Sequence, residues 1–437
     1  MKKILILLAA VAIAASCEPS TGSTAEITFS LEMNGAAYVS PDRQISVTDL
    51  NTSTTFTVTT GTDGKARIQL LPGVYEASVS FQIEENGETA LVNAIRSDIT
   101  AVAGQKQTYT LNLIGSKKSS IVIKEFYNSG CQKDDGSGST MNDGYVILYN
   151  NSDKAVDASN YCFAFCGINS FGGEMDDYTV NGKLVFEDEG FIPAFQGIWR
   201  FNTNVTIEPY SQIVVALFSA IDHTQTYSNS VNLSNSSYYV MYNPESGWNM
   251  ENKYITPSAN IPTDHYLKAS IFGIQAIAWS ISASGPAFFI FEKENAHDYV
   301  MNPDNIDERN MWKGARIPFA WIVDGVEIFG TEYPEDNRKR FTAHVDAGKV
   351  MHTSQMGYTL YRNVDKEATE ALDSNAGKLV YGYAGGTSDA GVTYGSTDPS
   401  GIDAEKSIAN GAKIIYKDTN NSTNDFHERK YASLTGK

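Results

Sequence analysis

Four cysteines are the residues of this chain whose spacing most directly suggests chemistry. Three of them, which we call the body cysteines, lie well inside the chain: Cys131, Cys162 and Cys166. On one extended strand the thiols of Cys162 and Cys166 would be about 13 Å apart, too far for a disulfide unless the strand bends. We therefore expect Cys131 to form a disulfide with one of the other two. A metal site with three thiolates is the alternative, but no histidine lies at a supporting spacing.

Two acidic loops carry carboxylates of the kind that bind calcium. The first loop contains Asp134, Asp135 and Asp143, and the second contains Asp304 and Asp307. Neither loop has the spacing of an EF-hand, and Asp, Asn and Gly also favour solvated turns without any ion. We therefore expect turns here, with calcium as the alternative, and we expect no other cofactor.

The motifs of the common enzyme classes are missing from the sequence. It has no Gly-x-Ser-x-Gly elbow, no phosphate-binding Gly-x-x-x-x-Gly-Lys-Ser/Thr, no dinucleotide fingerprint and no His-Glu-x-x-His pair. Met351, His352 and Met356 could ligate copper or haem iron, but methionine is more often a core residue. The carboxylate runs 176–177 and 187–189 are more typical of an acidic surface than of a glycosidase. We expect a protein that is not an enzyme.

Aromatic residues are concentrated in two stretches that are expected to form loops. The candidates for ligand binding are Tyr238, Tyr239, Tyr242, Trp248, Tyr254 and Trp312. Exposed rings of this kind stack on sugars or anchor a protein partner. The alternative is that these rings pack the loops onto the fold, because most aromatic side chains are largely buried.

The composition indicates which elements must position these residues. The chain has 437 residues, enough for two or three domains. Its 42% hydrophobic and 19% charged residues exclude a disordered or coiled-coil chain. The 24 Tyr, 20 Phe and 35 Gly favour strands and turns. With 33 basic and 51 acidic residues the net charge is −18, and such a surface repels the phosphates of nucleic acids.

The N-terminus is typical of an exported, lipid-anchored protein. A basic start at residues 1–3 precedes an apolar stretch, 4–15, that is too short to span a bilayer. The sequence Ala-Ala-Ser-Cys ending at Cys17 resembles the lipobox of bacterial lipoproteins, although the first Ala stands where Leu is commonest. The resemblance implies removal of residues 1–16 and lipidation of Cys17; an ordinary secretory signal is the alternative.

A polar tether, residues 17–25, follows the lipobox. Glu18 directly after the lipidated cysteine resembles a weak form of the tag that exports Bacteroidetes lipoproteins to the cell surface. The resemblance implies an outer-membrane protein that faces the cell exterior. No later segment has the run of about 18 apolar residues that a transmembrane helix needs, so the lipid is expected to be the only membrane contact.

Residues 26–114 alternate between apolar and polar side chains, with turns between the alternating runs. Ile27, Phe29 and Leu31 share one face of the first strand, and turns are expected at 62–65 and 72–73. The run Thr-Asp-Gly-Lys-Ala-Arg-Ile-Gln-Leu-Leu-Pro-Gly-Val-Tyr resembles the hallmark of carboxypeptidase-regulatory-like β-sandwich domains. In that family the domain is a rigid spacer and not a catalyst.

Residues 119–437 follow a short polar linker. The stretches 121–128 and 143–157 are similar to the opening strands of the lamin-tail domain, with Ile147 in place of the usual Glu. Further stretches resemble later strands of the same family: 207–216, 321–330 and 418–426. The resemblance implies an immunoglobulin-like β-sandwich with long insertions.

The insertions are expected to carry the function, because loops on a rigid sandwich commonly hold binding residues. They cover residues 163–206, 223–284 and 295–316, and helices are expected at 364–374 and 302–312. The fold class that we expect is mainly β, with two immunoglobulin-like β-sandwich domains in tandem and a few short helices. A lipobox, a regulatory-like sandwich and an expanded lamin-tail-like region together resemble a family of Bacteroidetes lipoproteins of unknown function.

The expected function is that of a non-enzymatic surface lipoprotein that captures a ligand or docks on a TonB-dependent outer-membrane receptor. This expectation depends on the lipobox, the spacer-like first domain and the missing catalytic motifs. By analogy, surface lipoproteins of this size often accompany such receptors. The alternative is a free-standing glycan-binding or adhesive module.

Overall fold

The computed structural model describes residues 23–52, 54–85, 88–167, 169–180, 183–248, 254–273, 278–279, 281–311 and 313–436. The chain divides into two compact units, which are described separately. Of the described residues, unit 1 contains those up to Leu31 together with Tyr38–Ala77 and Arg96–Thr110. Unit 2 contains Glu32–Ala37, Ser78–Ile95 and the residues from Leu111 onwards. Cys17 and the expected signal lie outside the described residues.

The N-terminal strands form one sheet of eight strands in the order β2-β1-β8-β7-β6-β3-β4, with β5 paired to β1. Their bounds are β1 Ala25–Met33, β2 Ala36–Ala37, β3 Gln44–Asp49, β4 Thr55–Thr59, β5 Lys65–Leu70, β6 Gly73–Glu85, β7 Glu88–Ala101 and β8 Lys106–Lys117. Along β1 buried and half-buried residues alternate. Ile27, Phe29 and Leu31 are buried, which confirms the face predicted from the alternation.

A tight turn before β5 explains one of the glycines of unit 1. Gly64 has a φ of +73°, and a Cβ at this position would lie 2.9 Å from the Cα of Val39. Asp63 beside it accepts hydrogen bonds from the Lys65 backbone N–H at 3.1 Å and from the Arg67 guanidinium at 2.6 Å. The turn predicted at residues 62–65 is therefore present, and only glycine fits its left-handed position without strain.

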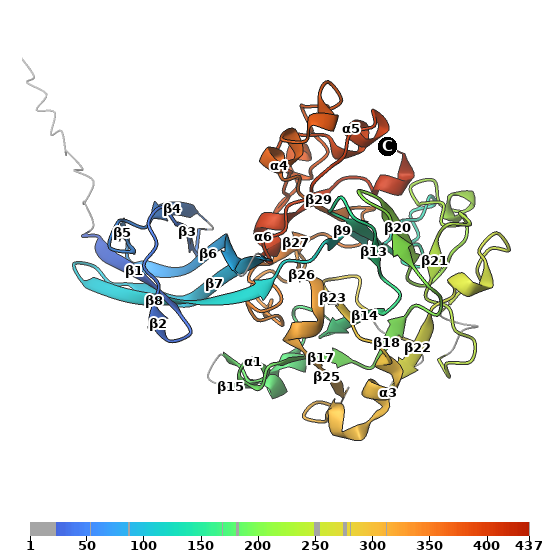
Figure 1. The fold of residues 1–437 in the computed structure, drawn as a ribbon, viewed down its shortest axis with the longest axis horizontal. Helices are drawn as coiled ribbons and strands as arrows, with labels where there is room; N and C mark the ends of the chain where they lie inside the picture. The colour runs from blue at the N-terminus through green and yellow to red at the C-terminus, as the bar shows by residue number, and fades with distance from the viewer. Residues whose placement is uncertain are drawn as a thin grey trace, which may run out of the picture. The chain divides into compact units, whose positions relative to one another are not determined.

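Unit 2 contains two sheets of six strands each (Figure 1). The first has the order β21-β20-β12-β9-β28-β29, and the second has the order β22-β18-β14-β23-β26-β27. The strands of the first are β9 Ile121–Tyr127, β12 Tyr145–Asn150, β20 Gln212–Ala216, β21 Tyr239–Val240, β28 Thr359–Arg362 and β29 Phe426–Arg429. The strands of the second are β14 Tyr161–Cys166, β18 Gly197–Arg200, β22 Lys268–Ile271, β23 Ala287–Glu292, β26 Ile322–Gly330 and β27 Val350–His352.

Shorter strands join the loops of unit 2 to each other. They are β10 Cys131–Gln132 with β11 Ser139–Thr140, β13 Val156–Asp157 with β19 Thr206–Ile207, β15 Thr179–Val180 with β16 Lys183–Leu184, and the trio β17 Phe191–Phe195, β25 Gly314–Pro318 and β24 Ile306–Asp307. In this trio β17 belongs to the expected insertion 163–206, whereas β24 and most of β25 belong to the insertion 295–316. The two insertions therefore pair with each other in a small sheet.

The two large sheets of unit 2 pack face to face around one core. Phe126 of β9 stacks on Phe288 of β23 with ring centroids 4.6 Å apart, and both belong to one cluster of buried side chains. Strands β9, β12 and β14 are buried along their whole length. Burial on both faces explains why the sequences of β12 and β14 are nearly continuous apolar runs and do not alternate. The expected mainly-β fold with tandem sandwiches is confirmed.

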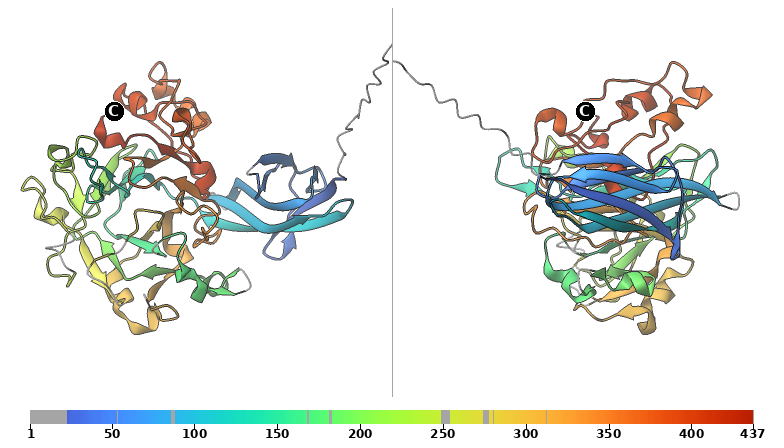
Figure 2. Two further views of the ribbon diagram at one scale, coloured as in Figure 1. Left: turned by 180° about the vertical axis from the view of Figure 1, so that it is seen from behind. Right: turned by 90° about the vertical axis from the view of Figure 1, so that its left-hand side faces the viewer.

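In the part of the chain that the structure describes, the helices are few and short. They are α1 Phe186–Glu189, α3 Ala296–Met301, α4 Lys366–Glu370, α5 Ala404–Ala409 and α6 Ser422–Asp425. In both views of Figure 2 the segment with α4 and α5, in orange and red, lies on the opposite side of the unit 2 strands from α3. Within the described ranges no helix is both long and apolar enough to cross a lipid bilayer.

One expected helix forms and the other does not. Helix α4 lies inside the predicted stretch 364–374, and the carboxylate of Asp365 caps it by accepting the backbone N–H of Ala368 at 3.0 Å. The helix predicted at 302–312 is wrong. Pro303 begins only a short turn, after which the chain enters strand β24. The residue before a proline is biased towards extended backbone, which stops α3 at Met301.

Candidate functional site

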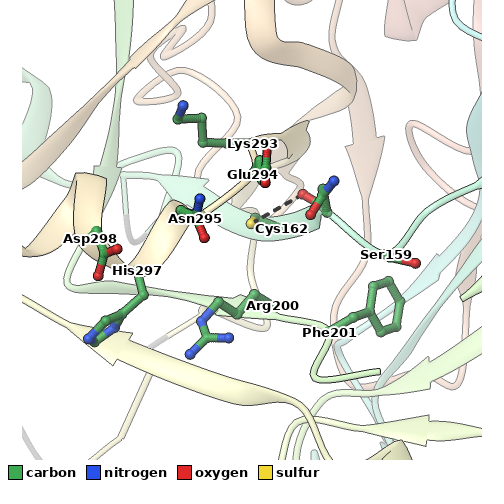
Figure 3. A pocket seen from close by; sticks show the side chains of 11 residues that line it. Ser159, Cys162, Arg200, Phe201, Lys293, Glu294, Asn295, His297 and Asp298 are labelled. Carbon is green, nitrogen blue, oxygen red and sulfur yellow. Dashed lines mark hydrogen bonds between the residues drawn. The ribbon is translucent and has the colours of Figure 1, made fainter. Parts of the chain in front are cut away.

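Unit 2 contains a pocket of about 450 Å³ (Figure 3). Strands β14 and β18 and the segment that joins β23 to α3 supply its walls. The lining residues are Ser159, Asn160, Cys162, Arg200, Phe201, Lys293, Glu294, Asn295, Ala296, His297 and Asp298. Most of these side chains are polar, so the pocket suits a hydrophilic ligand better than an apolar one.

Cys162 forms part of the floor of this pocket. It lies directly opposite Arg200 in the antiparallel pairing of β14 with β18. The thiol donates to the Asn160 carbonyl with a sulfur–oxygen distance of 3.7 Å. Burial raises the pKa of the Cys162 thiol to about 12, although the nearby Arg200 charge opposes the shift. The thiol is therefore neutral at physiological pH and is not an activated nucleophile.

Arg200 is the unusual residue of the pocket. It is half-buried at the end of β18, and its Nε atom is buried without a hydrogen-bond partner. No hydrogen bond or ion pair between described residues involves its guanidinium. Figure 3 shows the Arg200 side chain and the His297 ring extending towards the same side of the pocket. Because no described residue pairs with this half-buried guanidinium, its outer N–H groups can bind an acceptor that arrives from solution.

The other charged groups of the pocket are mostly occupied or exposed. The Lys293 ammonium lies 4.9 Å from the centroid of the Trp321 ring, in a cation–π contact. The Nδ1 atom of His297 lies 2.8 Å from the Ser270 hydroxyl of β22. Glu294 and Asp298 are exposed at the rim. The pocket thus combines the unpaired, half-buried guanidinium of Arg200 with the exposed carboxylates of Glu294 and Asp298 at its rim.

Two amide side chains complete the polar lining. Asn295 precedes α3 with a left-handed φ of +54°, a conformation that asparagine tolerates better than most residues. Its side chain caps nothing. Asn160 is exposed, and its carbonyl accepts the Lys293 backbone N–H at 3.1 Å. Both amides can therefore donate to and accept from a bound hydroxyl group.

The structure contradicts the expected disulfide. All three body cysteines are free and buried. The Cys131 thiol points to the Asp143 carboxylate at 3.8 Å, and the Cys166 thiol points to the Arg340 carbonyl at 3.8 Å. The prediction of a bridge from Cys131 is wrong because its neighbours in space are polar groups of its own loop region. The three thiols do not share a metal site either, since no group of three or more potential ligands occurs among the described residues.

The carboxylates proposed for calcium are held by protein donors. Asp134 accepts from the Ser228 backbone N–H and hydroxyl at 3.0 and 2.9 Å. Asp135 caps a turn by accepting the N–H of Ser137 at 2.8 Å. The solvated turn that we favoured therefore describes Asp135, and Asp134 fastens its loop to a neighbouring loop.

The remaining three acidic candidates lie apart. Asp143 is buried and accepts from the Tyr127 and Ser230 hydroxyls; burial raises its pKa. Asp307 is buried and pairs with Arg309 at 2.8 Å and with Arg316 at 3.6 Å, while Asp304 is exposed in the turn before β24. These arrangements indicate structural roles for Asp143 and Asp307.

Most of the aromatic candidates pack against other aromatic side chains of unit 2. Trp248 and Tyr254 are buried, and both lie against Trp199 with centroids 5.4 and 5.9 Å apart. Their interpretation as exposed ligand-binding rings is wrong, because they fill the core. Tyr239 stacks on His265 at 4.3 Å. Of the others, Tyr238 and Tyr242 are half-buried, and Trp312 lies outside the described residues.

A buried chain of hydrogen bonds has the order of a serine-hydrolase triad. The Ser129 hydroxyl lies 2.9 Å from His352 Nε2, and His352 Nδ1 lies 3.1 Å from Glu428 Oε1. All three residues are at most 1% exposed. Glu428 also accepts the Thr353 backbone N–H and the Thr387 hydroxyl. No substrate can contact a buried hydroxyl, so we interpret the chain as a cross-link between the loop after β9 and strands β27 and β29.

Arg200 and Asn295 were not singled out from the sequence. Both lie in expected insertions, 163–206 and 295–316, but no motif marks them. Cys162 is the one lining residue that the sequence analysis names as a candidate, and it was expected to take part in a disulfide or a metal site. The pocket depends on strand pairing between β14 and β18, which sequence spacing alone does not reveal.

Comparisons with known proteins identify relatives of this fold. Residues 208–382 match a family model described as "Protein of unknown function (DUF4876)". A crystallised DUF4876 family protein from Bacteroides thetaiotaomicron VPI-5482 is similar over 92% of this chain and 94% of that chain, with 18% identity and a TM-score of 0.50. A DUF3823 family protein from Parabacteroides merdae ATCC 43184 covers 34% of this chain and 69% of that chain, with 12% identity and a TM-score of 0.15.

No curated protein matches the chain. The resemblance to a Bacteroidetes family of unknown function is nonetheless confirmed at the level of family model and fold. The segment 208–382 matches the DUF4876 family, and the chain as a whole has a fold similar to that of a DUF4876 protein from Bacteroides.

Proposed function

We propose that this protein is a non-enzymatic lipoprotein of the outer-membrane surface that captures a small ligand and delivers it to a TonB-dependent transporter. The observation that carries the capture role is the unpaired Arg200 guanidinium beside a cavity of about 450 Å³. The chain has 51 acidic and 33 basic residues, so carboxylate partners are plentiful. An arginine that stays unpaired in such a chain is available to a ligand.

The chemistry of the pocket supports binding without catalysis. The Cys162 thiol is neutral, and the Ser270 hydroxyl that is hydrogen-bonded to the His297 ring is buried, so a substrate does not reach it. Catalysis by a nucleophile needs a base within hydrogen-bond reach of it. The one serine–histidine–glutamate chain noted above is buried away from solvent. These features favour a binding protein over a hydrolase.

The surface location and the transporter partnership rest on the N-terminal sequence. A lipid on Cys17 would hold the protein at the membrane, and the tether of residues 17–25 would let the folded units reach a neighbour. The acidic net charge keeps such a protein from binding nonspecifically to anionic surfaces.

The test is a pull-down of the native lipoprotein from its own outer membrane in mild detergent. We expect a TonB-dependent receptor to co-purify in near-stoichiometric amount. A Cys17→Ser variant, which cannot take the lipid, is the matched control and should leave the membrane fraction. A clean monomer with no membrane partner would overturn the transporter role, and confinement of the protein to the periplasmic leaflet would overturn the surface location.

A free-standing glycan-binding module is the second candidate, and one observation favours it. Tyr381 is 55% exposed, and its hydroxyl donates to Glu370 at 2.9 Å beside a hollow of about 300 Å³. An exposed ring next to a carboxylate can stack on a sugar and bind its hydroxyl groups. Retention on a polysaccharide affinity gel that Tyr381→Ala abolishes would support this candidate. The control is Tyr394→Ala, which removes a similarly exposed ring elsewhere.

A further inference from the structure

We propose that the pocket beside Arg200 takes the carboxylate of an acidic saccharide, with the guanidinium as the residue that determines specificity. This inference rests on the proposed capture function and names its ligand class. It follows from three features of the pocket: the unpaired guanidinium, the signs of the surrounding charges and the amide groups at the rim.

The guanidinium determines the charged part of the ligand. Arginine presents N–H donors in a planar fork that matches two oxygens of a carboxylate. The Nε atom of Arg200, one arm of this fork, is buried without a partner in the free protein. A carboxylate in the pocket would meet the outer N–H groups of this half-buried guanidinium, which pair with no described residue, so binding would gain charge-assisted hydrogen bonds without breaking one within the protein.

The surrounding charges favour a single negative charge over a doubly charged group. Glu294 and Asp298 line the rim and are exposed. Lys293 is the other cation of the lining, and its ammonium contacts the Trp321 ring. Two carboxylates at the entrance repel a phosphate dianion about twice as strongly as a monoanion. The pocket is therefore expected to prefer a carboxylate to inorganic phosphate.

The remaining lining groups match a polyhydroxylated body. The amides of Asn160 and Asn295 offer both donors and acceptors, and the rim carboxylates accept from hydroxyl groups. The cavity of about 450 Å³ lies in the range of small-molecule sites. A ring that carries several hydroxyls and one carboxylate, as in a uronic acid, satisfies these groups together.

The experiment is calorimetric titration of the full-length chain, purified in mild detergent, with galacturonate, galactose and inorganic phosphate. We expect binding of galacturonate at millimolar or lower concentration and at least tenfold weaker binding of galactose and phosphate. Arg200→Gln should weaken galacturonate binding about tenfold to hundredfold, and Arg200→Lys, which keeps the charge but loses the fork, should give an intermediate loss. The control Arg67→Gln removes an exposed arginine of unit 1 and should change nothing.

Thermal unfolding separates this role from a structural one. Arg200 makes no hydrogen bond that a glutamine would break, so Arg200→Gln should unfold at the same temperature as the wild type. Equal affinity for galactose and galacturonate, tighter binding of phosphate, or no binding of any probe would each overturn the inference. The proposed capture and transport role would still be decided by the pull-down, since that experiment does not depend on the ligand.

Discussion

Replacement of Arg340 by methionine is expected to destabilise unit 2 strongly. The guanidinium is fully buried and donates from Nε and Nη2 to Glu327 Oε1 at 2.9 and 2.7 Å. It also donates to the carbonyls of Gly285 and Ile328 at 2.6 and 2.7 Å. Methionine would fill much of the space of the arginine stem but would donate none of these hydrogen bonds.

The magnitude follows from what the substitution leaves behind. Glu327 keeps two backbone donors, the N–H groups of Arg340 and Phe341 at 2.9 and 2.7 Å, and the Lys339 ammonium at 3.8 Å, but it loses the guanidinium that is hydrogen-bonded to it. Removing one partner of a buried ion pair costs about 3–5 kcal/mol, and each carbonyl left without a donor adds about 1 kcal/mol. We therefore expect a loss of about 4 kcal/mol or more. In the double variant Glu327→Gln/Arg340→Met the buried carboxylate charge is absent. Its free energy of unfolding should therefore be about 2 kcal/mol higher than that of Arg340→Met.

Urea denaturation followed by tryptophan fluorescence measures this loss in unit 2 alone. All five tryptophans follow residue 111, so the signal does not report on unit 1. The control Arg338→Met removes an exposed arginine two residues earlier and should cost less than about 1 kcal/mol. An Arg340→Met variant within about 1 kcal/mol of the wild type would refute the reasoning. So would a double variant no more stable than the single one.

Three further predictions follow from buried groups of unit 2. The body cysteines should not react with a thiol reagent such as DTNB in the native chain, and all three should react after unfolding; rapid reaction of the native protein would contradict their burial. Burial raises the pKa of Asp425 to about 7, so its contribution to stability is present below its unfolded pKa of about 4 and is lost as the pH rises to 7. Asp425→Asn should therefore gain more than about 1 kcal/mol relative to the wild type between pH 5 and pH 8, as measured by urea denaturation at each pH, and a constant difference would contradict this. Ser129 should not be labelled by a fluorophosphonate probe, and labelling that Ser129→Ala abolishes would show an accessible nucleophile.

The strands were the most predictable part of the fold. Alternation along Ile27, Phe29 and Leu31 determines which face of β1 is buried, and this local pattern needs no knowledge of the partner strand. The resemblance of residues 121–128 to an opening strand of the lamin-tail domain likewise predicted strand β9. The expected helix at 302–312 was wrong because a single proline outweighed the helical composition around it.

The candidate site was much less predictable, because it depends on contacts between distant segments. The reactivity of a cysteine depends on its neighbours in space, and for Cys131 the neighbour is Asp143 and not another thiol. Arg200 is one of many arginines and lysines in the sequence, and only the paired strands show that it lacks a carboxylate partner. Trp248 and Tyr254 show the converse, since residues typical of binding loops became core residues once the insertion folded.

The pairing of β29 with β28 has a consequence for how the chain reaches its native state. The Arg362 side chain in β28 bonds the Ile123 carbonyl in β9, 239 positions away, and Ser433 bonds Glu125, 308 positions away. Strand β9 is synthesised early, but these polar groups of β9 can form their native hydrogen bonds only after the C-terminal part of the chain, up to Ser433, has been synthesised. Such a topology folds slowly and only after the whole of unit 2 is available. A chaperone that keeps the strand edges of β9 covered until the chain is complete would meet a specific need of this fold.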